Sequence, residues 1–177
     1  VDQQFCDVMG SSYLLAHGLG IPVQNAATTV DFPSGGQYTL WVRTKDWVPG
    51  NWEAPGQFQV IVNSRAVKTT FGTQPGWRWQ KGGLVHIADK QVTVELKDLT
   101  GFDGRCDALY FTQDDSFVPP NEGRAMRNWR NKVLGIPEVP AVTQKFEVVI
   151  AGGGIAGCAA SLAAAQQGLI VALINDR

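Results

Sequence analysis

The sequence predicts a mainly β protein: an antiparallel jelly-roll β-sandwich, then a linker with a short helix, then one strand–helix–strand (βαβ) unit. Three observations lead to this prediction. Residues 1–115 hold short stretches in which apolar and polar residues alternate, separated by glycine and proline turns. Residues 116–145 place a short helical stretch between two proline-containing extended segments. Residues 146–177 place an alanine-rich stretch between two apolar, β-branched runs.

The alternation in the first part is clearest in three stretches, at 38–43, 57–62 and 92–97. A period of two puts apolar side chains on one face only, which is typical of half-buried strands. Turn signals rich in glycine and proline separate the stretches, for example at 33–36 and 75–76. Because no convincing helix interrupts this part, we predict an antiparallel sandwich or jelly roll.

The segment 44–56 interrupts two predicted strands and carries Trp47, Asn51 and Trp52. A sugar ring stacks on an indole face while its hydroxyl groups bond to nearby amides and carboxylates, so this segment is a candidate carbohydrate-binding loop. Trp77 lies in a second candidate segment. Large aromatic residues usually serve packing first, so a structural role remains the alternative for the tryptophans.

The cysteines and paired acids give no clear metal site. Cys6, Cys106 and Cys158 include no C-x-x-C pair, so neither a zinc site nor a disulfide scaffold is expected. A Cys6–Cys106 bridge stays open beside the commoner isolated buried thiol. Asp103 and Asp107 supply two carboxylates, whereas calcium takes six or more oxygen ligands, so we predict no metal.

The linker holds a predicted helix from Asn121, as its N-cap, to Gly135. Three apolar residues share one face of this helix: Met126, Trp129 and Val133. We expect that face to dock on a domain. Three arginines lie beside it: Arg124, Arg127 and Arg130. They are expected to face solvent or bridge to the domain's carboxylates, with binding of an anion as the alternative.

The C-terminal part contains G-x-G-x-x-G at Gly152, Gly154 and Gly157, between a β-branched run and a helix. The first glycine permits a tight turn, the second lets a pyrophosphate approach the backbone, and the third lets helix and strand pack closely. A membrane helix is the alternative, because no charge occurs from 148 to 175. The glycine turn and the Gln-Gln-Gly stop at 166–168 argue against it.

The stretch 149–168 resembles the N-terminal ADP-binding unit of FAD-dependent oxidoreductases, with three glycines, small residues along the helix and a glycine before the second strand. The resemblance implies that 146–177 begins a Rossmann-like FAD-binding domain and that the parent protein is an FAD-dependent oxidoreductase. It implies that five residues surround the pyrophosphate: Gly152, Gly154, Ile155, Ala156 and Gly157.

In that family the second strand ends in an acid that binds the adenosine ribose. Here Asn175 stands at that position and Asp176 follows it. Asparagine can accept a hydroxyl hydrogen bond but carries no charge, so the ribose contact falls to either residue. NAD remains the alternative cofactor, because the residues that would contact the second half of a dinucleotide are not in this stretch.

The first part has a resemblance of its own, which spans 5–113. The runs 36–43, 55–63, 91–96 and 101–111 resemble the galactose-binding-like jelly roll of carbohydrate-binding modules. Together the two halves resemble FAD-dependent oxidoreductases that carry such a sandwich before the flavin domain. The sandwich is then expected to be a carbohydrate-binding module that binds a glycan, or an interdomain scaffold with no catalysis of its own.

The formal net charge of −1 argues against nucleic acid and anionic membranes as partners. One βαβ unit cannot cover both faces of its strands. We therefore expect the remainder of the flavin domain, in the same chain or a second one, to complete it. The 177-residue chain alone is expected to be inactive, with its catalytic residues beyond residue 177. The compartment stays open, with secreted or periplasmic favoured.

Overall fold

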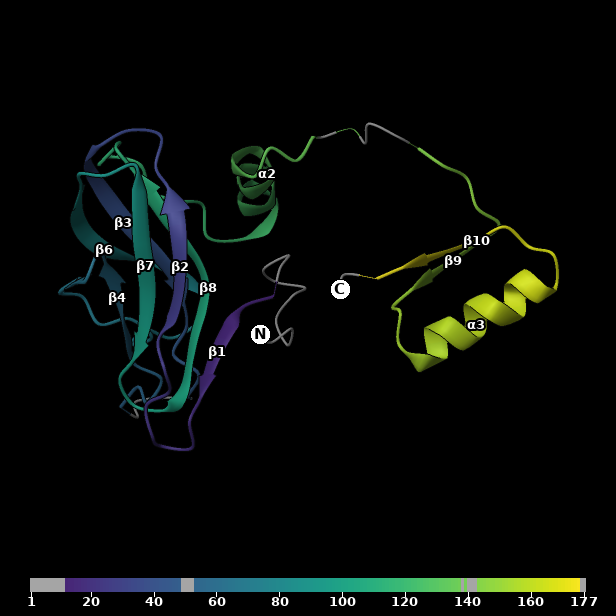
Figure 1. The fold of residues 1–177 in the computed structure, drawn as a ribbon, viewed down its shortest axis with the longest axis horizontal. Coiled ribbons are helices and arrows are strands. Elements are labelled where there is room, and N and C mark those ends of the chain that lie inside the picture. The colour runs from purple at the N-terminus through teal and green to yellow at the C-terminus, as the bar shows by residue number, and fades with distance from the viewer. Residues whose placement is uncertain (1–11, 49–52, 138, 140–142, 176–177) are drawn as a thin grey trace. The chain divides into compact units, whose positions relative to one another are not determined.

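The computed structural model describes residues 12–48, 53–137, 139 and 143–175. The chain divides into two compact units, Val1–Leu134 and Gly135–Arg177, and Figure 1 labels most of their elements. The first unit contains two four-stranded sheets and one helix, and the second contains a two-stranded sheet and one helix within the described residues.

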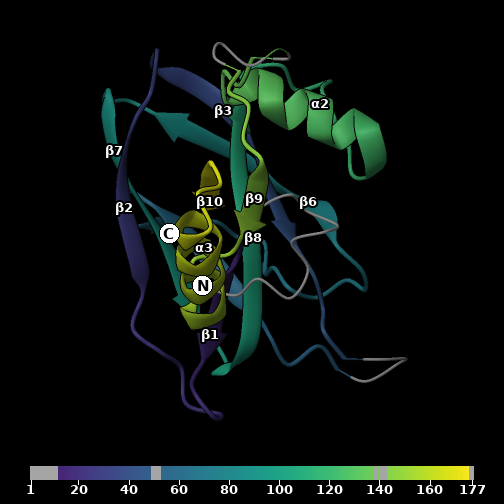
Figure 2. The same cartoon turned by 90° about the vertical axis from the view of Figure 1, so that its right-hand side faces the viewer.

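The first unit is an antiparallel β-sandwich, as the alternating pattern predicted. One sheet has the strand order β1 (Leu14–His17), β8 (Phe102–Thr112), β3 (Gly36–Thr44), β6 (Arg78–Ile87). The other sheet has the order β2 (Ala26–Asp31), β7 (Gln91–Asp98), β4 (Phe58–Val62), β5 (Arg65–Ala66). Figure 2 shows β2 and β7 in one layer and β3, β6 and β8 in the other.

The core lies between the two sheets and follows from the period of two. In β4, Phe58, Val60 and Val62 are buried while the residues between them are partly exposed. Strand β3 differs, because seven of its residues in a row are buried, Tyr38–Thr44. A strand in the middle of a sheet is buried on both faces only where something covers the outer face. The outer face of β3 therefore needs a cover, which the linker supplies.

The cover is helix α2 (Gly123–Val133) with the segment that precedes it. Met126 is fully buried, and the Trp129 ring meets the Tyr110 ring edge-on with centroids 4.9 Å apart. The Trp79 indole N–H donates to the Pro120 carbonyl at 3.1 Å. The predicted docking of the apolar face is therefore confirmed for Met126 and Trp129, while Val133 stays half exposed.

The predicted N-cap of this helix was wrong. Glu122 occupies the cap position and makes no side-chain capping bond. Asn121 instead donates its side-chain amide to the Trp77 carbonyl at 2.9 Å. A tertiary hydrogen bond has replaced the local one, because the segment before α2 runs along the sandwich.

The second unit has the predicted order of strand, helix and strand. It consists of β9 (Val148–Ala151), α3 (Ile155–Gln166) and β10 (Val171–Ile174). The two strands are parallel, with Val148 opposite Val171. Gly168 ends the helix with φ +83, a left-handed conformation that glycine adopts without strain. Among the described residues, no helix is long and apolar enough to span a membrane.

Candidate functional site

The glycine turn between β9 and α3 is built so that a side chain cannot fit at its third glycine. Gly152 has φ +105, which favours glycine. A Cβ on Gly157 would lie 1.8 Å from the Gly152 carbonyl oxygen, so helix and turn touch backbone to backbone. A Cβ on Gly154 would meet nothing within 4 Å. The space in front of Gly154 is therefore open within this unit.

The start of α3 offers hydrogen-bond donors to that open space. The first helical bond shown runs from the Cys158 N–H to the Gly154 carbonyl at 2.9 Å. The N–H groups of Ile155, Ala156 and Gly157 come before it, and such groups have no partner inside a helix. The Ile155 side chain is 94% exposed, and no acid stands in the first turn. The helix start can thus receive an anion, favoured by the helix dipole.

Asn175 follows β10 and reaches the glycine turn. Its Oδ1 accepts a hydrogen bond from the Gly153 N–H at 3.3 Å. A Cβ on Gly153 would come within 2.8 Å of the Asn175 Cγ, so this glycine makes room for that side chain. The structure therefore brings Asn175 to the turn, while Asp176 lies outside the described residues.

Trp47, one of the residues predicted to stack on a sugar, lies at the surface of the sandwich. Its side chain is 37% exposed, and its indole N–H donates to the Phe102 carbonyl at 3.0 Å. The Arg105 guanidinium carbon lies 5.7 Å from the centroid of the indole ring. These two contacts fix the orientation of the ring. The other two residues of the predicted loop, Asn51 and Trp52, lie outside the described residues.

Trp77 lies in the interior. Its side chain is 9% exposed, the Tyr13 ring meets it at an angle with centroids 5.0 Å apart, and the Arg43 guanidinium carbon lies 5.7 Å from its ring centroid. The indole therefore offers no exposed face on which a sugar could stack.

The two acids weighed as calcium ligands have other partners. His17 Nδ1 lies 2.5 Å from Asp103 Oδ1. The buried Asp107 carboxylate accepts hydrogen bonds from Arg43 at 3.0 Å and Arg130 at 2.7 Å. Desolvation lowers the pKa of Arg43, and the charge of Asp107 opposes that shift. In the described ranges, no group of three or more His, Cys, Asp or Glu residues is placed to hold a metal ion.

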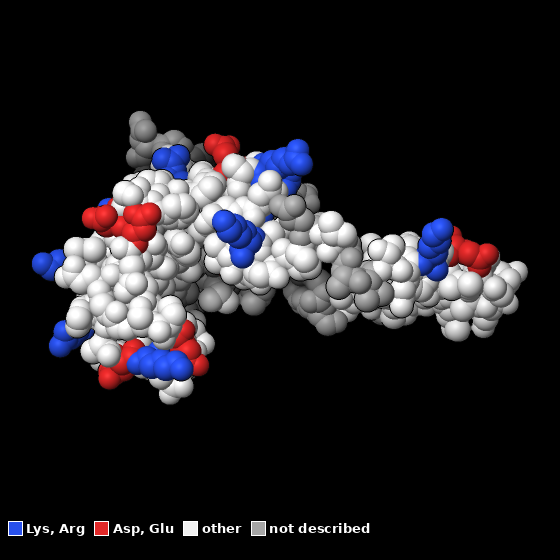
Figure 3. All heavy atoms as spheres, turned by 90° about the horizontal axis from the view of Figure 1, so that it is seen from above, with Lys and Arg blue, Asp and Glu red and all other residues white. Residues whose placement is uncertain are grey.

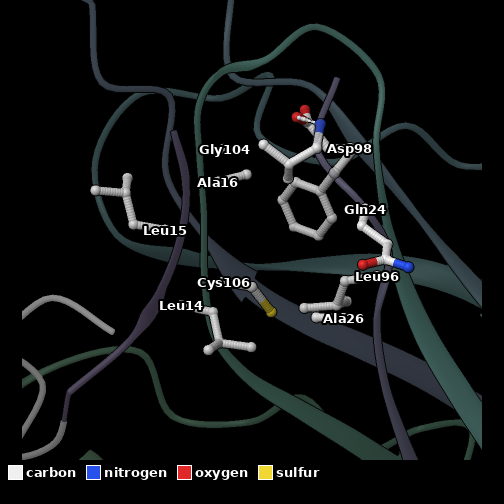
Figure 4. A pocket seen from close by; sticks show the side chains of 11 residues that line it. Leu14, Leu15, Ala16, Gln24, Ala26, Leu96, Asp98, Gly104 and Cys106 are labelled. Atoms are coloured by element: carbon white, nitrogen blue, oxygen red, sulfur yellow. Dashed lines mark hydrogen bonds between the residues drawn. The ribbon is translucent and has the colours of Figure 1, made fainter. Parts of the chain in front are cut away.

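An apolar pocket of about 200 Å³ opens between β1 and β2, at one side of the sandwich. Figure 4 shows the Cys106 sulfur in it, pointing toward Leu96 and Ala26. Burial raises the pKa of the Cys106 thiol to about 12. Asp98 also lines the pocket, but its carboxylate holds the backbone, accepting from the N–H groups of Val23 at 2.9 Å and Gly101 at 3.0 Å. The pocket therefore has no free reactive group of its own.

The cysteine bridge considered from the sequence stays a prediction. Cys106 is a buried free thiol, and Cys158 is an exposed one that donates to the Gly153 carbonyl at 3.3 Å. Cys6 lies outside the described residues. Among the hydrogen bonds of the described residues, none joins Cys106 or Cys158 to a histidine that could activate the thiol.

No protein-family model matches the sequence, and no curated protein matches it. Solved structures do match. A Podospora anserina GH26-CBM35 β-(1,4)-mannanase is 14% identical with a TM-score of 0.51, and the match covers 98% of this chain and 38% of that one. A family 35 carbohydrate-binding module from an environmental isolate is 14% identical with a TM-score of 0.49, covering 64% of this chain and 82% of that one.

A third match is the CBM35 from Cellvibrio japonicus Abf62, which is 17% identical with a TM-score of 0.48 over 63% of this chain and 81% of that one. At identities this low the likeness concerns the fold alone, and the statement about the fold rests on the match to the mannanase. The sandwich therefore has the antiparallel, jelly-roll fold of a protein that contains a carbohydrate-binding module. None of the three structures is named for a flavin or a nucleotide.

Proposed function

We propose that the sandwich is a carbohydrate-binding module, and that it precedes the FAD-binding domain of an oxidoreductase in the same polypeptide. The fold likeness supports the first part, because the mannanase that matches is named for a CBM35 module. The observation that carries it is the half-exposed indole of Trp47, held by Phe102 and Arg105. A secreted or periplasmic location accords with a glycan ligand.

The Trp47 indole is suited to stacking because it is already ordered. A ligand that stacks on a fixed ring does not lose affinity to the ordering of that side chain. The indole N–H is used by the Phe102 carbonyl, so the exposed ring surface remains for the apolar face of a sugar. Phe102 itself is half exposed and adds aromatic surface nearby.

Trp47→Ala tests this part. We expect neutral oligosaccharides to bind the chain weakly in isothermal titration, and the substitution to weaken binding by about 1 kcal/mol, because a ligand can cover only the exposed part of the indole and complete burial of a large apolar side chain contributes about 1.5–3 kcal/mol. Trp47→Phe should retain part of the affinity. Val30→Ala, at an exposed apolar site on β2, is the control and should change nothing.

Two outcomes contradict the sugar-binding part. One is that no oligosaccharide in a broad array binds the wild-type chain. The other is that binding survives Trp47→Ala unchanged. Either result leaves the sandwich as an interdomain scaffold, the second role considered from the sequence.

The dinucleotide part rests on the backbone contact between Gly157 and Gly152, which leaves no room for a Cβ. The turn would place a pyrophosphate against Gly154 and the N–H groups of Ile155, Ala156 and Gly157. Asn175, with Asp176, would bind the adenosine ribose. Bound FAD would supply hydride transfer, while these residues bind and orient it.

Gly154→Val tests the dinucleotide part in the polypeptide that carries this chain. The added side chain has open space within this unit, so we expect folding to survive while the pyrophosphate is displaced and flavin absorbance is lost. Gln166→Ala, at an exposed polar position at the end of α3 away from the glycine turn, is the control and should keep the flavin. Reconstitution with NAD in place of FAD decides between the two cofactors. A polypeptide that takes up neither cofactor contradicts the proposal.

A further inference from the structure

A groove of about 590 Å³ runs along the side of the sandwich opposite the Cys106 pocket. Its walls come from β5 and the residues after it, and from β6. These strands are the outermost ones of their sheets, at the ends away from β1 and β2. The volume falls within the range of ligand sites, roughly 300–1,000 Å³.

The groove is cationic. Arg65, Lys68 and His86 line it, and no acidic residue is among its lining residues. Within the described residues, none of the three side chains forms an ion pair or a hydrogen bond, whereas Arg43 and Arg130 both pair with Asp107. Figure 3 shows basic side chains, in blue, at the far left edge. This edge is the side on which Figure 1 labels β4 and β6. An uncompensated positive charge in a concavity attracts anions.

A tight hairpin turn holds Arg65 in place. Asn63 and Ser64 have φ of +44 and +63, so a two-residue turn with both residues left-handed joins β4 to β5. The Asn63 side chain accepts a hydrogen bond from the Thr93 N–H at 3.0 Å, which ties the turn to β7. Arg65 then pairs with Val62 across the hairpin.

The floor of the groove is fixed and open. The Thr69 hydroxyl donates to the Gly82 carbonyl at 3.0 Å, joining the two walls. A Cβ on Gly82 would lie 3.0 Å from Leu40 and Phe71, so the strand lies directly on the core at this point. A Cβ on Gly83 would meet nothing within 4 Å. Leu84 is 65% exposed at the same site and offers an apolar surface.

We propose that this groove binds an acidic polysaccharide and that it recognises the carboxylate or sulfate groups of that polysaccharide. Arg65 and Lys68 would pair with the anionic groups, and Leu84 would contact the apolar face of a sugar ring. Two permanent cations in a chain of net charge −1 are too few for nucleic acid, which needs a broad basic surface. The choice of a saccharide rests on the proposed function of the sandwich.

The test is titration of the chain with three ligands: an oligogalacturonate, a sulfated heparin-derived oligosaccharide and a neutral oligosaccharide. We expect one or both acidic ligands to bind, and their relative affinities identify the anionic group. The Arg65→Ala/Lys68→Ala variant should bind the acidic ligand about tenfold more weakly, at about threefold for each exposed ion pair that is lost. Binding of the neutral ligand should not change.

The matched control is Lys90→Ala/Arg124→Ala, which removes the same charge from exposed positions outside the groove. An equal loss in this control, or no binding of either acidic ligand to the wild type, overturns the proposal. Equally tight binding of single-stranded DNA or an acidic peptide also overturns it. Trp47→Ala should leave acidic binding intact, so failure of the Trp47 surface and failure of the groove give different results.

Discussion

At the scale of single residues, Asp107 is the most consequential one that the sequence left open. It was weighed as a calcium ligand, but its fully buried carboxylate joins Arg43 of β3 to Arg130 of α2. The bridge between the linker arginines and a domain carboxylate was an expectation, and it is confirmed for Arg130. The sequence could not identify the carboxylate that Arg130 binds, because that choice depends on where α2 docks.

Removing this carboxylate should destabilise the first unit strongly. Asp107→Ala leaves Arg43 buried without its counter-charge, and breaking a buried pair in this way costs about 3–5 kcal/mol. Denaturant unfolding followed by tryptophan fluorescence measures the change. Asp89→Ala, at an exposed turn, is the control and should cost well under about 1 kcal/mol. A loss for Asp107→Ala no larger than in the control would falsify the structural role given to this carboxylate.

Cys106 gives a pH dependence with a definite sign. Burial raises the pKa of its thiol from 9.0 to about 12. The folded state therefore holds this proton more tightly than the unfolded state, so its contribution to stability is full below pH 9.0 and is lost as the pH rises toward about 12. Cys106→Ala should show a shallower loss of unfolding free energy over that interval. Identical slopes in the two proteins would contradict the burial of this thiol.

At the scale of elements, the local sequence patterns predicted three strands of the sandwich and both described helices. The alternating stretches correspond to β3, β4 and β7, and the glycine turn opens α3 as expected. The helix predicted for 121–135 is present as Gly123–Val133. These elements carry their signal within about ten neighbouring residues, as periodicity or turn chemistry.

Other elements depend on distant partners and were not predicted. Strand β1 pairs with β8, about ninety residues later in the chain, and β2 shows no buried residue in its pattern. The groove of Arg65, Lys68 and His86 joins β6 to a two-residue strand. Each residue looked ordinary in sequence, because the groove exists only once the two sheets are stacked.

The same distinction separates the two candidate sites. The glycine turn is contiguous, so its residues could be named from the sequence alone. The Trp47 surface depends on Phe102 and Arg105, which lie more than fifty residues further on and were not linked to it. The sequence could likewise not tell Trp47 from Trp77, since exposure is decided by packing.

At the scale of the whole molecule, the chain holds two compact units of different character. The sandwich covers its apolar residues with a second sheet and with α2. The βαβ unit has no fully buried residue among those described, and its apolar side chains are exposed on both strands and the helix. An apolar helix of this kind is typical of one that packs on other elements of a larger domain.

Titration of the wild-type chain with a panel of neutral and acidic oligosaccharides measures directly whether the sandwich binds carbohydrate. We expect saturable binding of at least one sugar, quenching of tryptophan fluorescence on binding, and loss of the neutral-sugar signal in Trp47→Ala. A folded, monodisperse chain that binds no sugar in the panel would contradict it.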